Sequence, residues 1–266
     1  ALSTNTTGAQ NCAFGHAALV SNTTGSDNTA LGYIALYTNT TGGQNTAVGR
    51  EALYLNSTAS NNTALGYRAL FVNTTGHTNT AVGRNALGAN TTGNSNNAFG
   101  AYALDANTTG VQSNAFGTYA LTNSTTGQLN NAFGQQALED CTTGDQNSAF
   151  GHDALRELTT ADYNSAFGSQ ALGTNVTGGS NTAVGRQALY ALTNGGSNSG
   201  VGFQALKNVT TGGTNSALGH TCGDEITTGS NNLCLGYAAG SGSSPSGNIT
   251  TGSNNVVLGN NSISNL

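Results

Sequence analysis

Three histidines occupy one position of a repeated pattern and are the first side chains to consider for chemistry. His16, His152 and His220 each follow the glycine of an A-φ-G phrase, where φ is Phe, Leu or Val. A histidine ring around a threefold axis can bind a metal ion or an anion. The same position accepts unrelated residues elsewhere, which indicates a solvated position and no metal site: Tyr33, Arg50, Tyr67, Arg84, Arg186 and Phe203.

Six of the eleven acidic residues lie between positions 139 and 162. Carboxylates on neighbouring repeats can converge on calcium, which prefers oxygen ligands. However, the G-G-x-G-x-D phrase of calcium-binding rolls is absent. We therefore predict an acidic patch and no metal ligands, cofactor or catalytic residues. The patch comprises Glu139, Asp140, Asp145, Asp153, Glu157 and Asp162.

The four cysteines fall into two groups. Cys222 and Cys234 each stand where other copies of the repeat have an alanine. The aligned copies thus form two apolar columns, which are expected to face each other. They are predicted to form either a disulfide or two buried thiols. Cys12 and Cys141 stand in polar columns of distant repeats, so free thiols or interchain bridges are open to them.

Asparagine and threonine recur as N-x-S/T, the acceptor sequence for N-linked glycans where the source has the machinery. Asparagine and threonine can equally stack in ladders, with threonine and glycine serving a turn. Both interpretations are carried forward for Asn5, Asn22, Asn39, Asn56, Asn73, Asn90, Asn107, Asn175, Asn208 and Asn248.

A strict repeat positions all of these residues. The glycine that closes each A-φ-G phrase recurs from Gly15 to Gly236 with a constant 17-residue spacing and no insertion. One more copy closes at Gly259 after a 23-residue step, and this longer step contains GSGSSPSG with the only proline. We predict regular repeats over 1–236 and an irregular final coil over 237–266. That coil, with an extruded loop at 240–247, would be a cap or a docking end.

The consensus N-T-A-φ-G-x-x-A-L-x-x-N-T-T-G-x-x predicts the fold. Glycine or asparagine every few positions excludes long helices, and a 17-residue unit is too short for a helical hairpin. Threonine and the φ residues favour strands, and glycine allows sharp corners. We predict an all-β fold, a parallel β-solenoid or β-roll of about 15 coils. Each coil would have strands near T-A-φ-G and A-L and a turn at T-T-G, with T-A-φ-G inside and N-T-T-G outside.

Two pairs of apolar columns suggest self-association. Adjacent residues of a strand point to opposite faces, so the alanines would line the interior and Leu, Phe and Val an outer face. An exposed apolar stripe of this length is typical of an interface. We predict a homo-oligomer, most simply a trimer; the alternative is a flattened monomer with both columns inside.

Composition excludes several classes of protein. Charged residues are 6% of the chain, against about 25% in ordinary domains. The net charge is −5 with only six Lys and Arg, so no basic track for nucleic acid is expected. No apolar run approaches the roughly 20 residues of a membrane helix, so no membrane insertion is expected. The sequence also lacks the acid/base or Arg–Lys cluster of a β-helical enzyme.

The phrase NTALGYxALxxNTTGxxNTAVGxxAL resembles the repeat regions of bacteriophage and prophage tail-fibre proteins. It is similar, more distantly, to the heads of trimeric autotransporter adhesins, in which shorter coils build a trimeric left-handed β-roll. The resemblance covers residues 1–259. It implies an extracellular location, on a virion fibre or a cell-surface appendage, and host-surface glycans as partners.

Together these features predict a non-enzymatic structural and adhesive protein. A rigid β-solenoid shaft would project from its anchor or stack end to end, because both ends of a solenoid expose unpaired strand edges. It would present a repeated Asn/Thr surface. The alternative is an ice-binding protein, in which regular threonines on a flat face order water.

Overall fold

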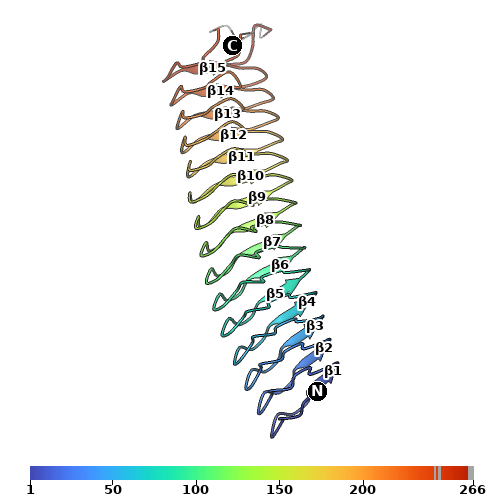
Figure 1. The fold of residues 1–266 in the computed structure, drawn as a ribbon. Helices are drawn as coiled ribbons and strands as arrows, with labels where there is room; N and C mark the ends of the chain where they lie inside the picture. Colours follow the sequence, from blue (N-terminus) through green and yellow to red (C-terminus); the bar gives the residue numbers. More distant parts are fainter. Residues whose placement is uncertain (243, 245–246, 263–266) are drawn as a thin grey trace. The chain divides into compact units, whose positions relative to one another are not determined.

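A computed structural model describes residues 1–242, 244 and 247–262. The chain divides into two compact units, Ala1–Ala132 and Phe133–Leu266. Each unit is a stack of 17-residue coils with one short strand per coil (Figure 1). The described residues contain no helix, and therefore no helix that could cross a membrane.

In the first unit, three-residue strands recur with a 17-residue spacing. Each strand pairs in parallel with the next, and equivalent residues lie opposite each other, such as Ala30 and Ala47. The strands are β1 (Cys12–Phe14), β2 (Thr29–Leu31), β3 (Thr46–Val48), β4 (Thr63–Leu65), β5 (Thr80–Val82), β6 (Asn97–Phe99) and β7 (Asn114–Phe116).

The second unit follows the same rule, and β8 (Asn131–Phe133) contains the boundary between the units. Its paired strands are β9 (Ser148–Phe150), β10 (Ser165–Phe167), β11 (Thr182–Val184), β12 (Ser199–Val201), β13 (Ser216–Leu218), β14 (Leu233–Leu235) and β15 (Val256–Leu258). The predicted parallel β-solenoid with a 17-residue spacing is confirmed.

The 23-residue step keeps the strand register, because Leu233 pairs with Val256 across it. Residues 243, 245 and 246 of the predicted loop at 240–247 lie outside the described residues. Of its other residues, Ser241 and Ser244 are buried. The proposed division into residues 1–236 and 237–266 stays a prediction.

The coil interior is built from alanine and leucine. The strand alanines point inward, and so do both residues of the A-L pair; Ala30, Ala35 and Leu36 are at most 1% exposed. The φ residues point outward from the strands, as predicted, with Leu31 44% exposed. The prediction that the leucines join this outer face is wrong.

The A-L pair also forms no strand, because its leucine has a left-handed backbone. Ile34 and Leu36 have φ of 49° and 51°, and the segment is a turn. A left-handed residue with a Cβ costs about 1–2 kcal/mol. Burying a leucine side chain contributes about 1.5–3 kcal/mol, which offsets that cost. The turn thus directs both Ala35 and Leu36 into the core.

The coil-closing glycine cannot be replaced without moving a neighbouring coil. Gly32 has φ of 143°, and a Cβ on it would collide with the carbonyl of Gly49 in the next coil. Only glycine combines this backbone with so close an approach. The strict 17-residue spacing of this glycine in the sequence follows from that contact.

An asparagine precedes every strand except β7, which follows Ser113. This residue, here called the strand asparagine, ties three coils together. Asn45 is fully buried, and its backbone N–H donates to Asn28 Oδ1 at 3.1 Å. Its Nδ2 donates to the carbonyl of Ala59 in the following coil at 2.9 Å. The same bonds recur in the second unit, for example from Asn198 to Asn181 and Gly212. Buried amides therefore have partners in the interior, where an unpaired amide would be costly.

Candidate functional site

The residue at the first position of each N-T-T-G phrase, which is asparagine in most coils of the first unit, is here called the turn residue. It lies inside the coil. Asn39 is fully buried, and its Nδ2 donates to Asn22 Oδ1 and to the Gly42 carbonyl, both at 2.9 Å. The expectation that N-T-T-G lies wholly outside is therefore wrong. The following threonine, Thr40, donates its hydroxyl to the carbonyl of Ser57 in the next coil. Only the second threonine, Thr41, is exposed.

This burial bears directly on the candidate glycosylation positions. A glycan cannot be attached to a fully buried, hydrogen-bonded amide in the folded coil. Asn5 is half-buried, and Asn208 and Asn248 are exposed, so a glycan at these three stays a prediction. The seven fully buried acceptors are Asn22, Asn39, Asn56, Asn73, Asn90, Asn107 and Asn175.

The ladder of turn asparagines ends at Asn107. In the next coil the turn residue is Ser124, whose shorter side chain does not reach back. Asn107 Oδ1 and Ser124 Oγ are buried without a hydrogen-bond partner. In the second unit the turn position is mainly apolar, with Cys141, Leu158, Leu192, Val209, Ile226 and Ile249 buried there.

The acidic residues of the second unit do not gather around one point. Glu139 pairs with Arg156 at 3.1 Å, and Asp153 lies 3.0 Å from the His152 ring. Asp162 accepts a hydrogen bond from the backbone N–H of Asp145. Over the described residues, no cluster of three or more His, Cys, Asp or Glu side chains could hold a metal ion.

Two of the three histidines in the predicted column stack on aromatic rings. His16 stacks on Tyr33 with ring centroids 5.1 Å apart. His220 stacks between Phe203 and Tyr237 at 4.9 and 5.5 Å. These two histidine rings therefore contact planar neighbours one coil away, whereas His152 contacts the Asp153 carboxylate.

Cys222 and Cys234 are buried neighbours, and the structure records both as free thiols. A hydrogen bond between them, together with burial, raises the pKa of Cys222. A disulfide between them stays a prediction. Cys141 is also buried, which raises its pKa to about 12, whereas Cys12 is exposed.

A buried carboxylate with two arginine partners lies on the first unit. Glu51 is 5% exposed and accepts hydrogen bonds from Arg50 Nε at 2.9 Å and Arg68 Nε at 2.5 Å. The bond from Arg68 holds the pKa of Glu51 below its usual range. The Arg68 guanidinium also lies 4.8 Å from the centroid of the Phe71 ring. An ion pair and a cation–π contact thus fix this arginine.

The residue that follows each A-L pair lies beside its equivalent in the next coil, so these residues form a column. Three consecutive coils have an aromatic ring at this position, and Phe71 is the last of the three. Tyr37 stacks on Tyr54 at 5.4 Å, and Tyr54 stacks on Phe71 at 5.3 Å. The next two positions of the column are Gly88 and Asp105. Because Gly88 has no side chain, the column is interrupted directly after Phe71.

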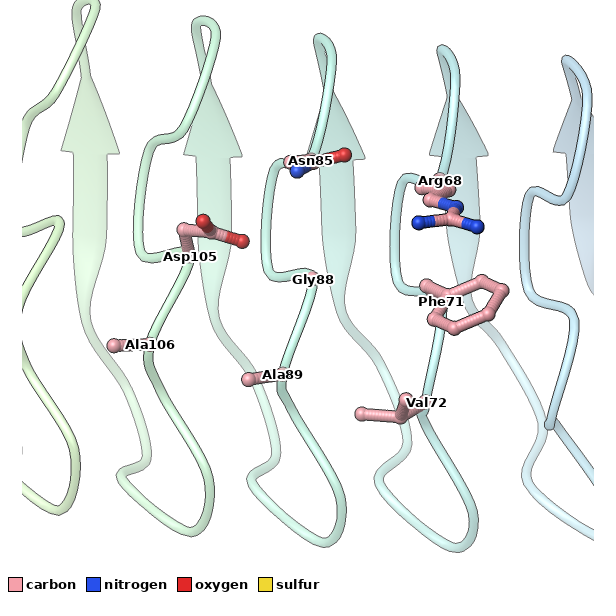
Figure 2. A pocket seen from close by; sticks show the side chains of 8 residues that line it. All are labelled: Arg68, Phe71, Val72, Asn85, Gly88, Ala89, Asp105 and Ala106. Atoms are coloured by element: carbon pink, nitrogen blue, oxygen red, sulfur yellow. The ribbon is translucent and has the colours of Figure 1, made fainter.

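A hollow of about 340 Å³ occupies this interruption (Figure 2). The carboxylate of Asp105 points toward the coil of Gly88, and a Cβ on Gly88 would collide with Asp105 Oδ1. The residues that line the hollow are Arg68, Phe71, Val72, Asn85, Gly88, Ala89, Asp105 and Ala106. We call this the Gly88 pocket.

One buried acceptor in the Gly88 pocket has no hydrogen-bond partner among the described residues, and a half-buried carboxylate lies beside it. Asn85 Oδ1 is buried and accepts no hydrogen bond. Asp105 is half-buried, and burial raises the pKa of its carboxyl group. Buried acceptors without donors are rare in folded proteins, so they indicate a place where an external donor would be stabilised.

The second unit has a counterpart in the same column at Gly173. There the next side chain is a tyrosine: a Cβ on Gly173 would lie 3.1 Å from Tyr190 Cε2. The space around Gly173, Thr174 and Tyr190 is only about 40 Å³. A glycine in this column therefore leaves a pocket only where the next residue is small enough.

None of the residues that line the Gly88 pocket was among the predicted site residues. A signal was present, because glycine interrupts a column that reads Tyr37, Tyr54 and Phe71. Finding it requires aligning the variable positions of the repeat as well as the invariant ones.

Comparison with known proteins gave no match to a family model, a curated protein or a solved structure.

Proposed function

We propose that the chain is a non-enzymatic structural protein, a rigid β-solenoid shaft of an extracellular fibre. The observation that supports this is the coil-to-coil bonding of the buried asparagines. Asn73 Nδ2, for example, donates to Asn56 Oδ1 at 2.9 Å and to the Gly76 carbonyl at 2.8 Å. Such a stack resists local opening, because freeing one coil leaves buried amides unpaired in the next.

The outer strand face supplies a surface for self-association. Phe14, Leu31 and Leu65 are 74%, 44% and 47% exposed in one column, whereas Ala30 and Ala64 beneath them are buried. Apolar residues aligned in this way favour contact with a second copy of the same face. We propose a homotrimer as the simplest closed assembly, on a virion or cell-surface appendage whose partners include host-surface glycans.

Sedimentation equilibrium of the full chain tests the assembly. We expect three times the monomer mass for the unaltered protein and a monomer for the double variant Leu31→Lys/Leu65→Lys, with an unchanged circular dichroism spectrum. The matched control is Thr24→Lys, an exposed residue off the strands, which should leave the mass unchanged. A monomeric unaltered protein would refute the trimer.

Protease resistance tests the rigid shaft separately. A shaft should remain intact at protease concentrations that cut ordinary domains, because cleavage requires local opening. Rapid cleavage within the described coils would contradict the structural role whatever the mass of the assembly.

Ice binding is a second candidate, favoured by one observation. Thr29, Thr46, Thr63 and Thr80 point outward in register on consecutive strands of the first unit. The next two strands have Asn97 and Asn114 at this position, which limits the array to four coils. Thermal hysteresis in the purified protein would favour this function over the shaft.

A further inference from the structure

We propose that the Gly88 pocket binds a single saccharide ring. The pocket is open because Gly88 omits one side chain from the aromatic column, while Phe71 and Asp105 flank the missing position. The coils of Phe71 and Asp105 lie two strand spacings apart, roughly 9–10 Å. The Asp105 carboxylate reaches into this space, since its Oδ1 would collide with a Cβ on Gly88. A six-membered ring would therefore lie between the Phe71 ring and this carboxylate.

The polar groups of the pocket match a ring with several hydroxyl groups. Asn85 Oδ1, which has no donor among the described residues, and the half-buried Asp105 carboxylate can both accept hydrogen bonds. Arg68 uses Nε for Glu51, and Figure 2 shows its guanidinium beside the ring of Phe71. Neighbouring hydroxyls of a sugar can donate to the two acceptors and accept from arginine at once.

The apolar groups match the C–H face of the same ring. Phe71 provides an aromatic surface, and Val72, Ala89 and Ala106 line the remaining wall. Small-molecule sites combine such apolar lining with a few placed polar groups, usually in about 300–1,000 Å³. The hollow, at about 340 Å³, lies at the lower end and suits one ring.

Two other ligand classes fit less well. An organic cation would compete with Arg68, which already lies 4.8 Å from the Phe71 centroid, and would be repelled by its charge. A plain aromatic ring would stack on Phe71 but leave Asn85 Oδ1 and Asp105 without donors. A hydroxylated neutral ring avoids both penalties.

The inference rests on the proposed function for the source of the sugar, a glycan met outside the cell. It changes where recognition occurs: one pocket in the first unit instead of a repeated Asn/Thr surface. Binding to the pocket does not require a trimer, because every lining residue lies within Ala1–Ala132.

The test is a titration of the full chain with methyl glycosides of glucose, galactose and mannose, followed by protein-observed NMR. Indole and tetramethylammonium chloride serve as comparison ligands. We expect at least one glycoside to bind with a Kd of about 1 mM, typical of one weakly held ring. Binding only by indole or tetramethylammonium, or by none of the five, would overturn the proposal.

Three variants localise the binding. Gly88→Tyr fills the gap with the ring that the column lacks, and Asp105→Ala removes an acceptor without filling space. Each should weaken glycoside binding at least about tenfold, or about 1.4 kcal/mol. Gly173→Tyr is the matched control in the second unit and should leave the Kd unchanged.

These outcomes separate the two proposals. Binding that survives both Gly88→Tyr and Asp105→Ala overturns the pocket assignment but not the shaft. If Gly88→Tyr fails to fold, Asp105→Ala still decides. A monomeric, protease-sensitive chain that binds a glycoside through Asp105 would refute the shaft and leave the pocket standing.

Discussion

The turn residue is asparagine through most of the first unit and apolar through most of the second, although both units build the same coil. Asn56 and Asn73 bond to each other in one, while Leu192 and Val209 pack at the equivalent depth in the other. The turn residue is therefore buried in both units, whether its side chain is polar or apolar. A run of amides satisfies it through bonds between coils, and a run of apolar side chains satisfies it by packing. Asn175, between Leu158 and Leu192, is satisfied within its own coil, because its Nδ2 donates to the Gly178 carbonyl and its Oδ1 accepts from the Gly178 N–H.

The largest expected effect comes from exchanging the kinds of turn residue between the units, an apolar residue for an asparagine in the first and the reverse in the second. Asn73→Val should remove the donor to Asn56 Oδ1 and lower the free energy of unfolding by about 2–4 kcal/mol, since it leaves a buried polar atom unpaired. Val209→Asn should lower it by less, because the new amide can bond to Gly212 as Asn175 bonds to Gly178. Urea denaturation measures the change.

The exposed threonines of the same phrases provide controls for this exchange. Thr75→Val and Thr211→Val should change the free energy of unfolding by no more than about 0.5 kcal/mol, as for other surface positions. If Val209→Asn were as stable as the unaltered protein, burial alone would not explain the difference between the units.

The next effect concerns the two ion pairs. Glu51 is nearly buried between Arg50 and Arg68, whereas Glu139 and Arg156 are more exposed. Glu51→Gln should cost about 1–2 kcal/mol and Glu139→Gln less than about 0.5 kcal/mol. Thermal denaturation at neutral pH compares the two variants.

The sign of the pH dependence follows from the lowered pKa of Glu51. Its hydrogen bond from Arg68 stabilises the ionised form, so its contribution is present above the ordinary pKa of 4.5. The contribution is lost as the pH falls through the lower pKa of the folded state. Equal costs for Glu51→Gln at neutral pH and well below that folded-state pKa would contradict this assignment.

A smaller effect should come from extending the asparagine ladder by one coil. Ser124→Asn would place a donor near Asn107 Oδ1, and the glycine that receives the second bond elsewhere is present as Gly127. We expect a gain of about 1 kcal/mol. Ser124→Ala is the control, because it removes the unpaired hydroxyl without supplying a donor. An equal gain from both would show that the ladder is not involved.

The smallest effect belongs to Asp105. Burial raises its pKa above the ordinary value of 3.8, so ionisation destabilises the folded state and stability falls as the pH rises through the folded-state pKa. Asp105→Asn should therefore stabilise the protein at pH 7 by less than about 1 kcal/mol, because solvent screens a half-exposed group. Below the ordinary pKa the gain should vanish; a gain independent of pH would exclude ionisation as the cause.

Much of the fold could be predicted from repetition alone. The constant spacing of the glycines from Gly15 to Gly236 predicts one coil per repeat, and the strands begin at that same 17-residue spacing from β1 to β14. The alternation in T-A-φ places alanine inside and the φ residue outside, as the structure does at Ala30 and Leu31. A period-2 pattern identifies the faces of a strand without any knowledge of neighbours.

The same rule failed where the backbone leaves the strand. Applied to Ala35–Leu36 it places leucine outside, but the left-handed φ of Leu36 turns both side chains inward. The Gly88 pocket was missed for a related reason. It depends on which side chains follow one another in a variable column, which no single repeat displays.

The sequence by itself determined the coil length, the strand at T-A-φ and the need for glycine at the corner that follows it, because these depend on local backbone sterics and strict spacing. The tertiary structure decided that the turn asparagines lie inside. An asparagine is polar in isolation and predicts a surface position; only stacking places Asn22 Oδ1 within 2.9 Å of Asn39 Nδ2 and makes burial of both favourable. Stacking likewise decided that one missing side chain at Gly88 opens a pocket, whereas Tyr190 closes the space beside Gly173.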